Sequence, residues 1–508
     1  MTDEPISQEQ KQDLELQEAK KGHPRGLYTL FATEMWERFS YYGMRALLVL
    51  YLTATMEQHG FELSRADALS IYGIFTGLVY LTPIVGGLLA DKYLGQRKSI
   101  LIGGILMALG QSALALSAAG GMDERRFVLN MGLGLLILGN GFFKPNISTI
   151  VGSLYEDRDP RRDSAFTIFY MGINLGAFLS PLICGTLGQT VGWAYGFGSA
   201  ALGMVLGLVI FLALGKTLNE SGFPPGRTGN ELRLTLRDWL EVVGFVVVNA
   251  LLVFGFLNTW PLIPAAIQSI ILWGGLIILA GGFLTMVVLN TKGSEQWSRV
   301  GVIFILAVFT IFFWSGFEQA GGTFNLFANE NTNLSLFGKE NFIQASWFQS
   351  VNAIMIFALA PVFSMMWMYL SRIGKNPNTP AKFGIGLVLL GLGFVVMSMA
   401  NGYAQAGDKV SPMWLISVYL LHTLGELCLS PIGLSMVTKL SPPKIISLMM
   451  GFWFGCTALA NYLAAMLESI LHKFDLPLFP FLAWQGILAG IFLLCASPFL
   501  KKMMRGID

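Results

Sequence analysis

The chain has 508 residues, of which 54% are hydrophobic and only 13% are charged, with a net charge of +2. An ordinary soluble domain carries roughly 25% charged residues, so this composition argues against a soluble fold. The near-neutral charge gives no electrostatic reason to expect nucleic acid as a partner. The first 26 residues are polar, without the short apolar stretch of a secretory signal peptide.

Apolar stretches of spanning length recur along the rest of the chain. A helix needs about 20 apolar residues to cross the roughly 30 Å hydrocarbon layer of a bilayer. The sequence therefore predicts an all-α polytopic membrane protein with 14 transmembrane helices. We expect these at 27–54, 68–91, 98–119, 128–154, 162–189, 193–214, 238–258, 264–289, 299–320, 345–372, 380–401, 411–438, 445–471 and 476–500.

Basic residues are distributed very unevenly between the two predicted sides of the membrane. With both termini on one side, that side holds 24 of the 33 Lys and Arg residues and the other side holds six. Cytoplasmic segments carry the excess of Lys and Arg, so both termini are predicted to be cytoplasmic. The remaining three basic residues, Arg38, Arg45 and Lys144, fall within spans.

The long polar connection after residue 214 suggests two six-helix bundles with a separate hairpin between them. The expected divisions are a cytoplasmic segment at 1–26, a bundle at 27–214, linkers with an inserted hairpin at 215–298, a second bundle at 299–500 and a cytoplasmic tail at 501–508. The hairpin itself, 238–289, has ionisable residues only at its entry. We interpret it as a packing element.

The first helix carries an unusual number of polar residues. A charge in the middle of a span costs roughly 2.5–3.5 kcal/mol, so each one needs a reason. At 100° per residue the polar residues cover an arc of about 140°, which forms one face. A structural Glu34–Arg38 pair explains part of this face, but the two tyrosines favour a wet central cavity. The residues are Glu34, Glu37, Arg38, Tyr41, Tyr42 and Arg45.

Three further spans carry charged residues well inside their ends. Lys144 precedes Pro145 well inside its span, and we expect it to face a carboxylate of the protein or of a substrate. Glu318 and Glu426 are buried by position in the second half, and a carboxyl group in a low-dielectric site can exchange protons near physiological pH. His422 lies four residues before Glu426, and we favour a hydrogen bond to that carboxylate over a proton relay.

The remaining polar residues within spans are more ambiguous. Asn174, Asn352 and Trp453 either line the cavity or pack between helices, and the sequence does not decide between these. Glu468 is expected at a solvated outer rim. The histidines assemble no metal site, and no P-loop, activated serine or zinc-protease motif is present, so the sequence predicts neither an enzyme nor an ATP-driven pump.

Two sequence motifs resemble those of known transporters. GGLLADKYLGQRK resembles the loop motif of the major facilitator superfamily, with Gly87, Asp91, Gly95, Arg97 and Lys98 in the expected order. ERFSYYG, preceded by Glu34, matches the ExxERFxYYG signature of the proton-dependent oligopeptide transporter family. FTIFYMGINLG at 166–176 is similar to that family's second signature.

This resemblance implies a bacterial member with a major facilitator fold of 12 core helices plus the hairpin. It also implies a proton-coupled symporter that imports di- and tripeptides by alternating access. Arg45 and Lys144 would then hold the peptide carboxylate, and Asn174, Asn352 and Glu426 its amine. The side-chain pockets would be lined by Tyr41, Tyr42, Tyr80, Trp314 and Trp453. Proton coupling would involve Glu34, Glu37, Arg38, Lys144 and Glu318, with Glu318 paired to Arg45.

The expected partners are di- and tripeptides, protons and membrane lipid, with no nucleic acid, no metal and no cofactor beyond the coupling proton. The expected location is the bacterial inner membrane, where the protein would function as a monomer. Two alternatives stay open. The same fold could carry another small zwitterion or anion, such as nitrate or an amino-acid derivative, and a non-transport intramembrane protein is the weaker alternative.

Overall fold

The computed structural model describes residues 22–119, 122–156, 159, 161–223, 235–259 and 263–506. Within these ranges the fold consists of helices and their connections, and each of the 14 predicted spans contains one long helix. In the described part of the chain, eleven helices are long and apolar enough to cross a membrane by length and composition. The expectation of an all-α protein with 14 long helices is therefore confirmed.

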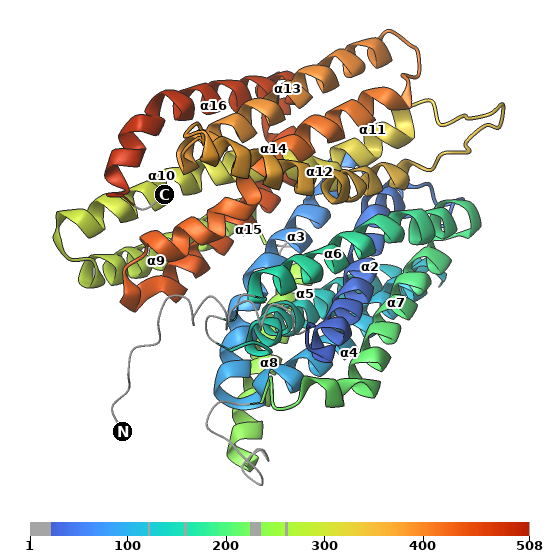
Figure 1. The fold of residues 1–508 in the computed structure, drawn as a ribbon. Coiled ribbons are helices and arrows are strands. Elements are labelled where there is room, and N and C mark those ends of the chain that lie inside the picture. Colours follow the sequence, from blue (N-terminus) through green and yellow to red (C-terminus); the bar gives the residue numbers. More distant parts are fainter. Residues whose placement is uncertain are drawn as a thin grey trace, which may run out of the picture.

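Figure 1 shows two groups of long helices that follow the chain order. The first group, here called the first bundle, contains α2 (Arg25–Thr53), α3 (Arg65–Leu89), α4 (Gly95–Ala119), α5 (Met122–Ser153), α6 (Arg162–Ser180) and α7 (Trp193–Ala213). The second bundle contains α10 (Gly293–Phe317), α12 (Phe348–Arg372), α13 (Thr379–Gln405), α14 (Pro412–Leu440), α15 (Ile446–His472) and α16 (Leu478–Met503).

The two helices between the bundles attach to different partners. Helix α8 (Leu236–Thr259) packs on α5 of the first bundle. Helix α9 (Ala265–Asn290) lies against the second bundle, where Phe283 stacks on Phe452 of α15 at a ring-centroid distance of 4.7 Å. The hairpin therefore has one helix on each bundle.

Several local features differ from the predicted spans. Helix α10 begins at Gly293, six residues before the predicted boundary of 299. Its first turn is polar, so the hydropathy of the sequence does not reveal that this turn is helical. A 3₁₀ turn at Glu318–Gly321 and a short helix α11 (Thr323–Asn331) follow α10 and were not predicted. Helix α6 continues as π-helical turns at Pro181–Gly185 and Leu187–Val191.

Glycine allows helices within each bundle to approach closely. A Cβ atom at Gly139 of α5 would lie 2.6 Å from the carbonyl oxygen of Gly103 on α4. A Cβ atom at Gly490 of α16 would lie 2.7 Å from the carbonyl oxygen of Gly384 on α13. The glycine-rich stretches of these spans are therefore packing surfaces between neighbouring helices.

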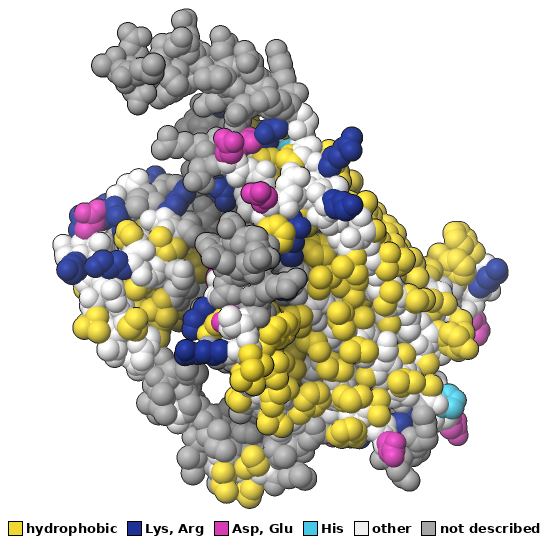
Figure 2. All heavy atoms as spheres, turned by 90° about the horizontal axis from the view of Figure 1, so that it is seen from below, with side chains coloured by type: hydrophobic (Ala, Val, Ile, Leu, Met, Phe, Trp, Pro, Cys, Tyr) yellow, Lys and Arg dark blue, Asp and Glu magenta, His cyan; other side chains and the backbone are white. Residues whose placement is uncertain are grey.

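The outside of the molecule is largely apolar. In Figure 2 hydrophobic side chains form a broad continuous surface on one side of the molecule, and Lys and Arg residues gather mainly beyond its edge. Helix α7 alone exposes Leu202, Val205, Val209 and Leu212. A continuous surface of this kind is suited to contact with lipid chains.

The two bundles meet through α3 with α15 and through α6 with α12. Hydrogen bonds that join them include those from Trp347 Nε1 to Thr186 Oγ1 at 2.9 Å, from Ser350 Oγ to the Phe178 carbonyl at 2.7 Å, and from Asn325 Nδ2 to the Ala46 carbonyl at 2.8 Å. These contacts lie toward the end of the molecule that the charge distribution places outside, here called the outer end. The structure is therefore closed at the outer end.

Candidate functional site

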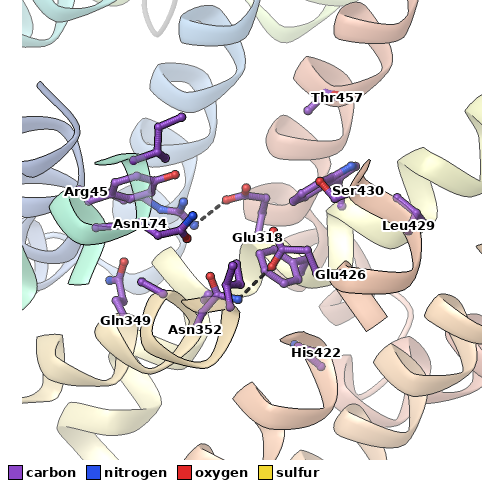
Figure 3. Close-up of a pocket in the computed structure, with 18 of the residues that line it drawn as sticks. Arg45, Asn174, Glu318, Gln349, Asn352, His422, Glu426, Leu429, Ser430 and Thr457 are labelled. Atoms are coloured by element: carbon purple, nitrogen blue, oxygen red, sulfur yellow. Dashed lines mark hydrogen bonds and ion pairs between the residues drawn. The ribbon is translucent and has the colours of Figure 1, made fainter. Parts of the chain in front are cut away.

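A cavity of about 320 Å³ lies between the two bundles. Both bundles supply its walls, and Figure 3 shows polar groups of the two halves facing one another across it. Most of the side chains predicted from the sequence as substrate-binding line this cavity. They are Tyr42, Arg45, Tyr80, Lys144, Asn174, Trp314, Asn352, Glu426 and Trp453, and Glu318 lines it as well.

An ion pair crosses the cavity between the bundles. Arg45 Nη2 donates to Glu318 Oε2 at 2.6 Å, and Arg45 Nε donates to the Tyr72 hydroxyl at 2.9 Å. Arg45 and Glu318 are both buried, at 9% and 4% exposure. A buried ion pair is costly to break unless both charges find new partners, so this pair is suited to a switch that exchanges partners.

Lys144 lies on the first-bundle wall of the cavity. Its Nζ atom lies 4.4 Å from the centre of the Tyr80 ring. Among the described residues no carboxylate lies within 4 Å of this ammonium group. A cation in contact with an aromatic face remains available for an anion, so Lys144 is placed to receive a carboxylate of a ligand.

The opposite wall carries an acidic group. Glu426 Oε2 accepts a hydrogen bond from Asn352 Nδ2 at 2.9 Å, and the same amide group donates to Thr423 Oγ1 at 3.0 Å. Asn174, from α6 of the first bundle, donates Nδ2 to the Tyr170 carbonyl at 3.0 Å. The cavity thus presents cations on one side and a fixed carboxyl group on the other.

A second charged cluster lies in α2 and does not line the cavity. Arg38 Nε lies 3.1 Å from Glu34 Oε1, which matches the pair expected from their spacing of four residues. Arg38 also binds Glu37 through both Nε and Nη2, the latter at 2.8 Å from Glu37 Oε1. Glu34 Oε2 is buried without a partner among the described residues. Two carboxyl groups therefore share one guanidinium, which leaves one acid available to hold a proton.

Two sequence expectations differ from the structure. Tyr41 is on the polar face of α2 but does not line the cavity, because its ring packs against Tyr42 and below Arg38. His422 does not form the favoured hydrogen bond with Glu426, whose carboxylate is instead bound by Asn352. The His422 ring lies among Phe317, Phe324 and Phe394, and its Nε2 atom has no partner among the described residues.

Sequence reasoning also missed several residues of the cavity. They are uncharged or apolar, so nothing in a single sequence separates them from helix-packing residues. A polar group on an otherwise apolar helix is the only signal that some of them carry. The missed lining residues include Tyr170, Phe317, Gln349, Ile356, Tyr419, Leu429 and Thr457.

Comparison with known proteins identifies the family. The sequence model described as the POT family matches residues 97–482. The chain belongs to the POT family. It is 40% identical to the peptide transporter YePEPT of Yersinia enterocolitica, over 94% of this chain and 93% of the relative. It is 39% identical to an uncharacterized transporter, YclF, of Bacillus subtilis, over 96% of each chain.

Solved structures of POT transporters resemble this fold over nearly its whole length. A crystal structure of a peptide transporter POT in complex with sulfate has a TM-score of 0.82 and 38% identity, covering 97% of this chain and 99% of the other. A POT family transporter in complex with 5-aminolevulinic acid has a TM-score of 0.80 and 32% identity, covering 95% and 98%. The prediction of a major facilitator fold is confirmed, and the protein is a multi-pass membrane transporter, not an enzyme.

The loop motif of this POT chain forms a separate anchor at the inner ends of α3 and α4. Gly87 lies in the last turn of α3, Asp91 in a π-helical turn, and Gly95, with a φ of 70°, begins α4. Asp91 Oδ1 accepts from Gln96 Nε2 at 3.2 Å, and Lys98 lies in the first turn of α4. The Arg97 guanidinium donates to the carbonyls of Ser221, Gly215 and Asn219. Arg97 therefore ties this motif to the segment after α7.

Proposed function

We propose that this POT protein is a proton-coupled symporter that imports di- and tripeptides by alternating access. The observation that carries the proposal is the charge pattern of the cavity. Lys144 stands without an acidic partner on one wall, and Glu426 stands on the other. A short peptide is a zwitterion, so its carboxylate and amine complement the two walls and bridge the bundles.

Relatives support the same cargo. The YePEPT protein is named a peptide transporter, and a protein that is 35% identical over 95% of this chain is named a di-/tripeptide transporter in Lactococcus lactis. In this proposal Arg45 and Lys144 hold the peptide carboxylate, while Asn174, Asn352 and Glu426 hold its amine. Tyr42, Tyr80, Trp314 and Trp453 then contact the peptide side chains.

Coupling follows from the ion pair across the cavity. Protonation of Glu318 removes its negative charge, which releases Arg45 for the peptide carboxylate and loosens the contact between the bundles. The cluster of Glu34, Glu37 and Arg38 provides a second proton-binding group. Each pH unit across the membrane supplies about 1.4 kcal/mol per proton, which is sufficient for a tenfold accumulation. The membrane is proposed to be the bacterial inner membrane, with both termini cytoplasmic.

Uptake of labelled dialanine into proteoliposomes tests the proposal. We expect accumulation when the proton gradient is directed inward and only equilibration without a gradient. The Glu318→Gln variant is expected to exchange dialanine between the two sides but to lose accumulation driven by the gradient. A variant at an exposed lysine of the loop after α12, Lys375→Gln, provides a control that is expected to accumulate dialanine normally.

The outcome that contradicts the proposal is also specific. Absence of dialanine uptake by the unaltered protein under every gradient would exclude peptide import. Accumulation that persists in Glu318→Gln would exclude the assigned coupling residue while leaving the cargo intact.

A second candidate cargo is another small zwitterion. The observation that favours it is the solved POT relative in complex with 5-aminolevulinic acid, whose amine and carboxylate have the same charges as a peptide's ends. Competition of 5-aminolevulinate with labelled dialanine for uptake measures the relative preference. If dialanine is not taken up but labelled 5-aminolevulinate is, this second cargo replaces the first.

A further inference from the structure

The cavity wall contains one amide group that the proposed roles do not use. Gln349 lies on α12 and lines the cavity. Its Nε2 atom is buried and has no hydrogen-bond partner among the described residues. A buried amide without a partner costs roughly 1–3 kcal/mol, so a group that completes its hydrogen bonds on binding is favoured.

The position of Gln349 relative to the proposed amine and carboxylate sites is informative. Asn352 is one turn further along α12, and its amide is already engaged by Thr423 and Glu426. In Figure 3 Gln349 and Asn352 lie beside each other below Asn174 and Arg45. Gln349 therefore extends from the second bundle next to Asn352, which the proposal assigns to the peptide amine.

The segment around Gln349 is held firmly. On either side of it, Trp347 hydrogen-bonds Thr186 and Ser350 hydrogen-bonds the Phe178 carbonyl, both across the contact with α6. These bonds fix the start of α12 relative to the first bundle while the structure is closed at the outer end. The Gln349 amide is consequently presented from a fixed backbone, which favours selective hydrogen bonding.

We infer that Gln349 hydrogen-bonds the peptide bond of the cargo and so distinguishes peptides from other zwitterions of the same length. The chemistry is complementary, because a primary amide offers both a donor and an acceptor, as a peptide bond does. The charged ends of a ligand are bound by other residues, so Gln349 contributes selectivity for the group between them. This inference rests on the proposed peptide transport.

The test compares two ligands in two purified variants. Dialanine contains a peptide bond, whereas 5-aminopentanoate has the same number of atoms between its amine and carboxylate and no peptide bond. Gln349→Met keeps a side chain of similar length without the amide. Ile354→Met introduces the same residue on an exposed part of α12 and is the control. Binding is measured by competition with labelled dialanine in detergent solution, without a proton gradient.

We expect Gln349→Met to weaken dialanine binding about two- to tenfold, the effect of one neutral hydrogen bond, and to leave 5-aminopentanoate binding within about twofold. Equal weakening for both ligands, or unchanged dialanine binding, overturns the inference. The unfolding midpoint of Gln349→Met is measured without ligand, and a lowered midpoint indicates a folding defect. In that case Gln349→Leu replaces it in the same comparison. Absence of dialanine binding by the unaltered protein would instead overturn the proposed function itself, and the inference with it.

Discussion

Arg45 of α2 and Glu318 at the end of α10 form a 2.6 Å ion pair although 273 residues separate them. This contact joins the two bundles directly at the cavity. Its geometry depends on Gly321, which lies beside both Arg45 and its second partner Tyr72. The 3₁₀ turn Glu318–Gly321 therefore supplies the carboxylate of the ion pair, and its glycine leaves the space that the Arg45 side chain occupies.

The first prediction concerns this close approach. A Cβ atom at Gly321 would overlap the Tyr72 hydroxyl and lie 2.7 Å from Arg45 Nε, so Gly321→Ala must move one of these side chains. We expect a decrease of about 1–3 kcal/mol in the free energy of unfolding, typical of overpacking, measured by thermal unfolding in detergent. Gly402→Ala on α13 is the control, because nothing lies within 4 Å of its Cβ position. Equal stability of the two variants would contradict the structural role of Gly321.

The second prediction concerns the unpaired ammonium group. Removing Lys144 as Lys144→Met is expected to weaken dialanine binding about 10- to 100-fold, because a hydrogen bond to a charged group is worth about 1.5–3 kcal/mol. Alanylalaninamide has no carboxylate, so its binding is expected to change little. Competition binding without a gradient measures both. A variant that weakens both ligands equally would show that Lys144 does not recognise the carboxylate.

A third prediction addresses the loop motif. Arg97 binds three carbonyl oxygens of the segment after α7 and lies 4.4 Å from the Phe223 ring centre. Arg97→Ala leaves these carbonyls without their donor, and we expect the free energy of unfolding to fall by roughly 1–3 kcal/mol. Thermal unfolding beside the exposed control Lys375→Ala measures the effect. An unfolding midpoint equal to that of the control would show that this anchor contributes little to stability.

The fold was largely predictable because hydropathy and length determine where helices can cross a bilayer. What hydropathy could not reveal is polar helical structure at the ends of spans, such as the first turn of α10 and the whole of α11. The first turn of α10 is exposed and carries an ion pair between Glu295 and Arg299, whereas α11 is a short helix that buries Phe324, Leu326 and Phe327. The boundaries were therefore less predictable than the number of helices.

The charged residues of the cavity could be predicted from the sequence, but its neutral lining residues could not. Charged residues within spans are expensive, which is why Arg45, Lys144, Glu318 and Glu426 stand out in the sequence alone. Helical periodicity also placed Tyr41 on the polar face of α2. This face spans an arc of about 140°, which is wider than the part of α2 that lines the cavity, and Tyr41 packs against Tyr42 and Arg38 instead. Gln349 carried only the signal of a polar group on an apolar helix, which is equally compatible with helix packing.

The outer end of the molecule contains a second ion-pair cluster between the bundles. Arg65 at the start of α3 binds Glu468 of α15 through Nε at 2.6 Å and Glu330 of α11 through Nη1 at 3.1 Å. The side chains of these three residues are between 30% and 49% exposed, so each pair is worth at most about 1 kcal/mol. Glu468, expected at a solvated rim, thus also takes part in closing the outer end.

The last prediction follows from this cluster. Arg65→Ala removes both pairs, and we expect the equilibrium to shift toward a form that is open at the outer end. The ratio of open to closed protein rises about tenfold for each 1.4 kcal/mol of stabilisation lost. Spin labels at Glu57 and Lys473, with the native cysteines replaced by serine, measure the separation across the outer end. We expect an additional longer distance in Arg65→Ala.

High salt should produce the same change in the unaltered protein and little further change in the variant, because salt screens exposed pairs. A distance distribution that responds to salt equally in both proteins would show that another contact holds the outer end closed.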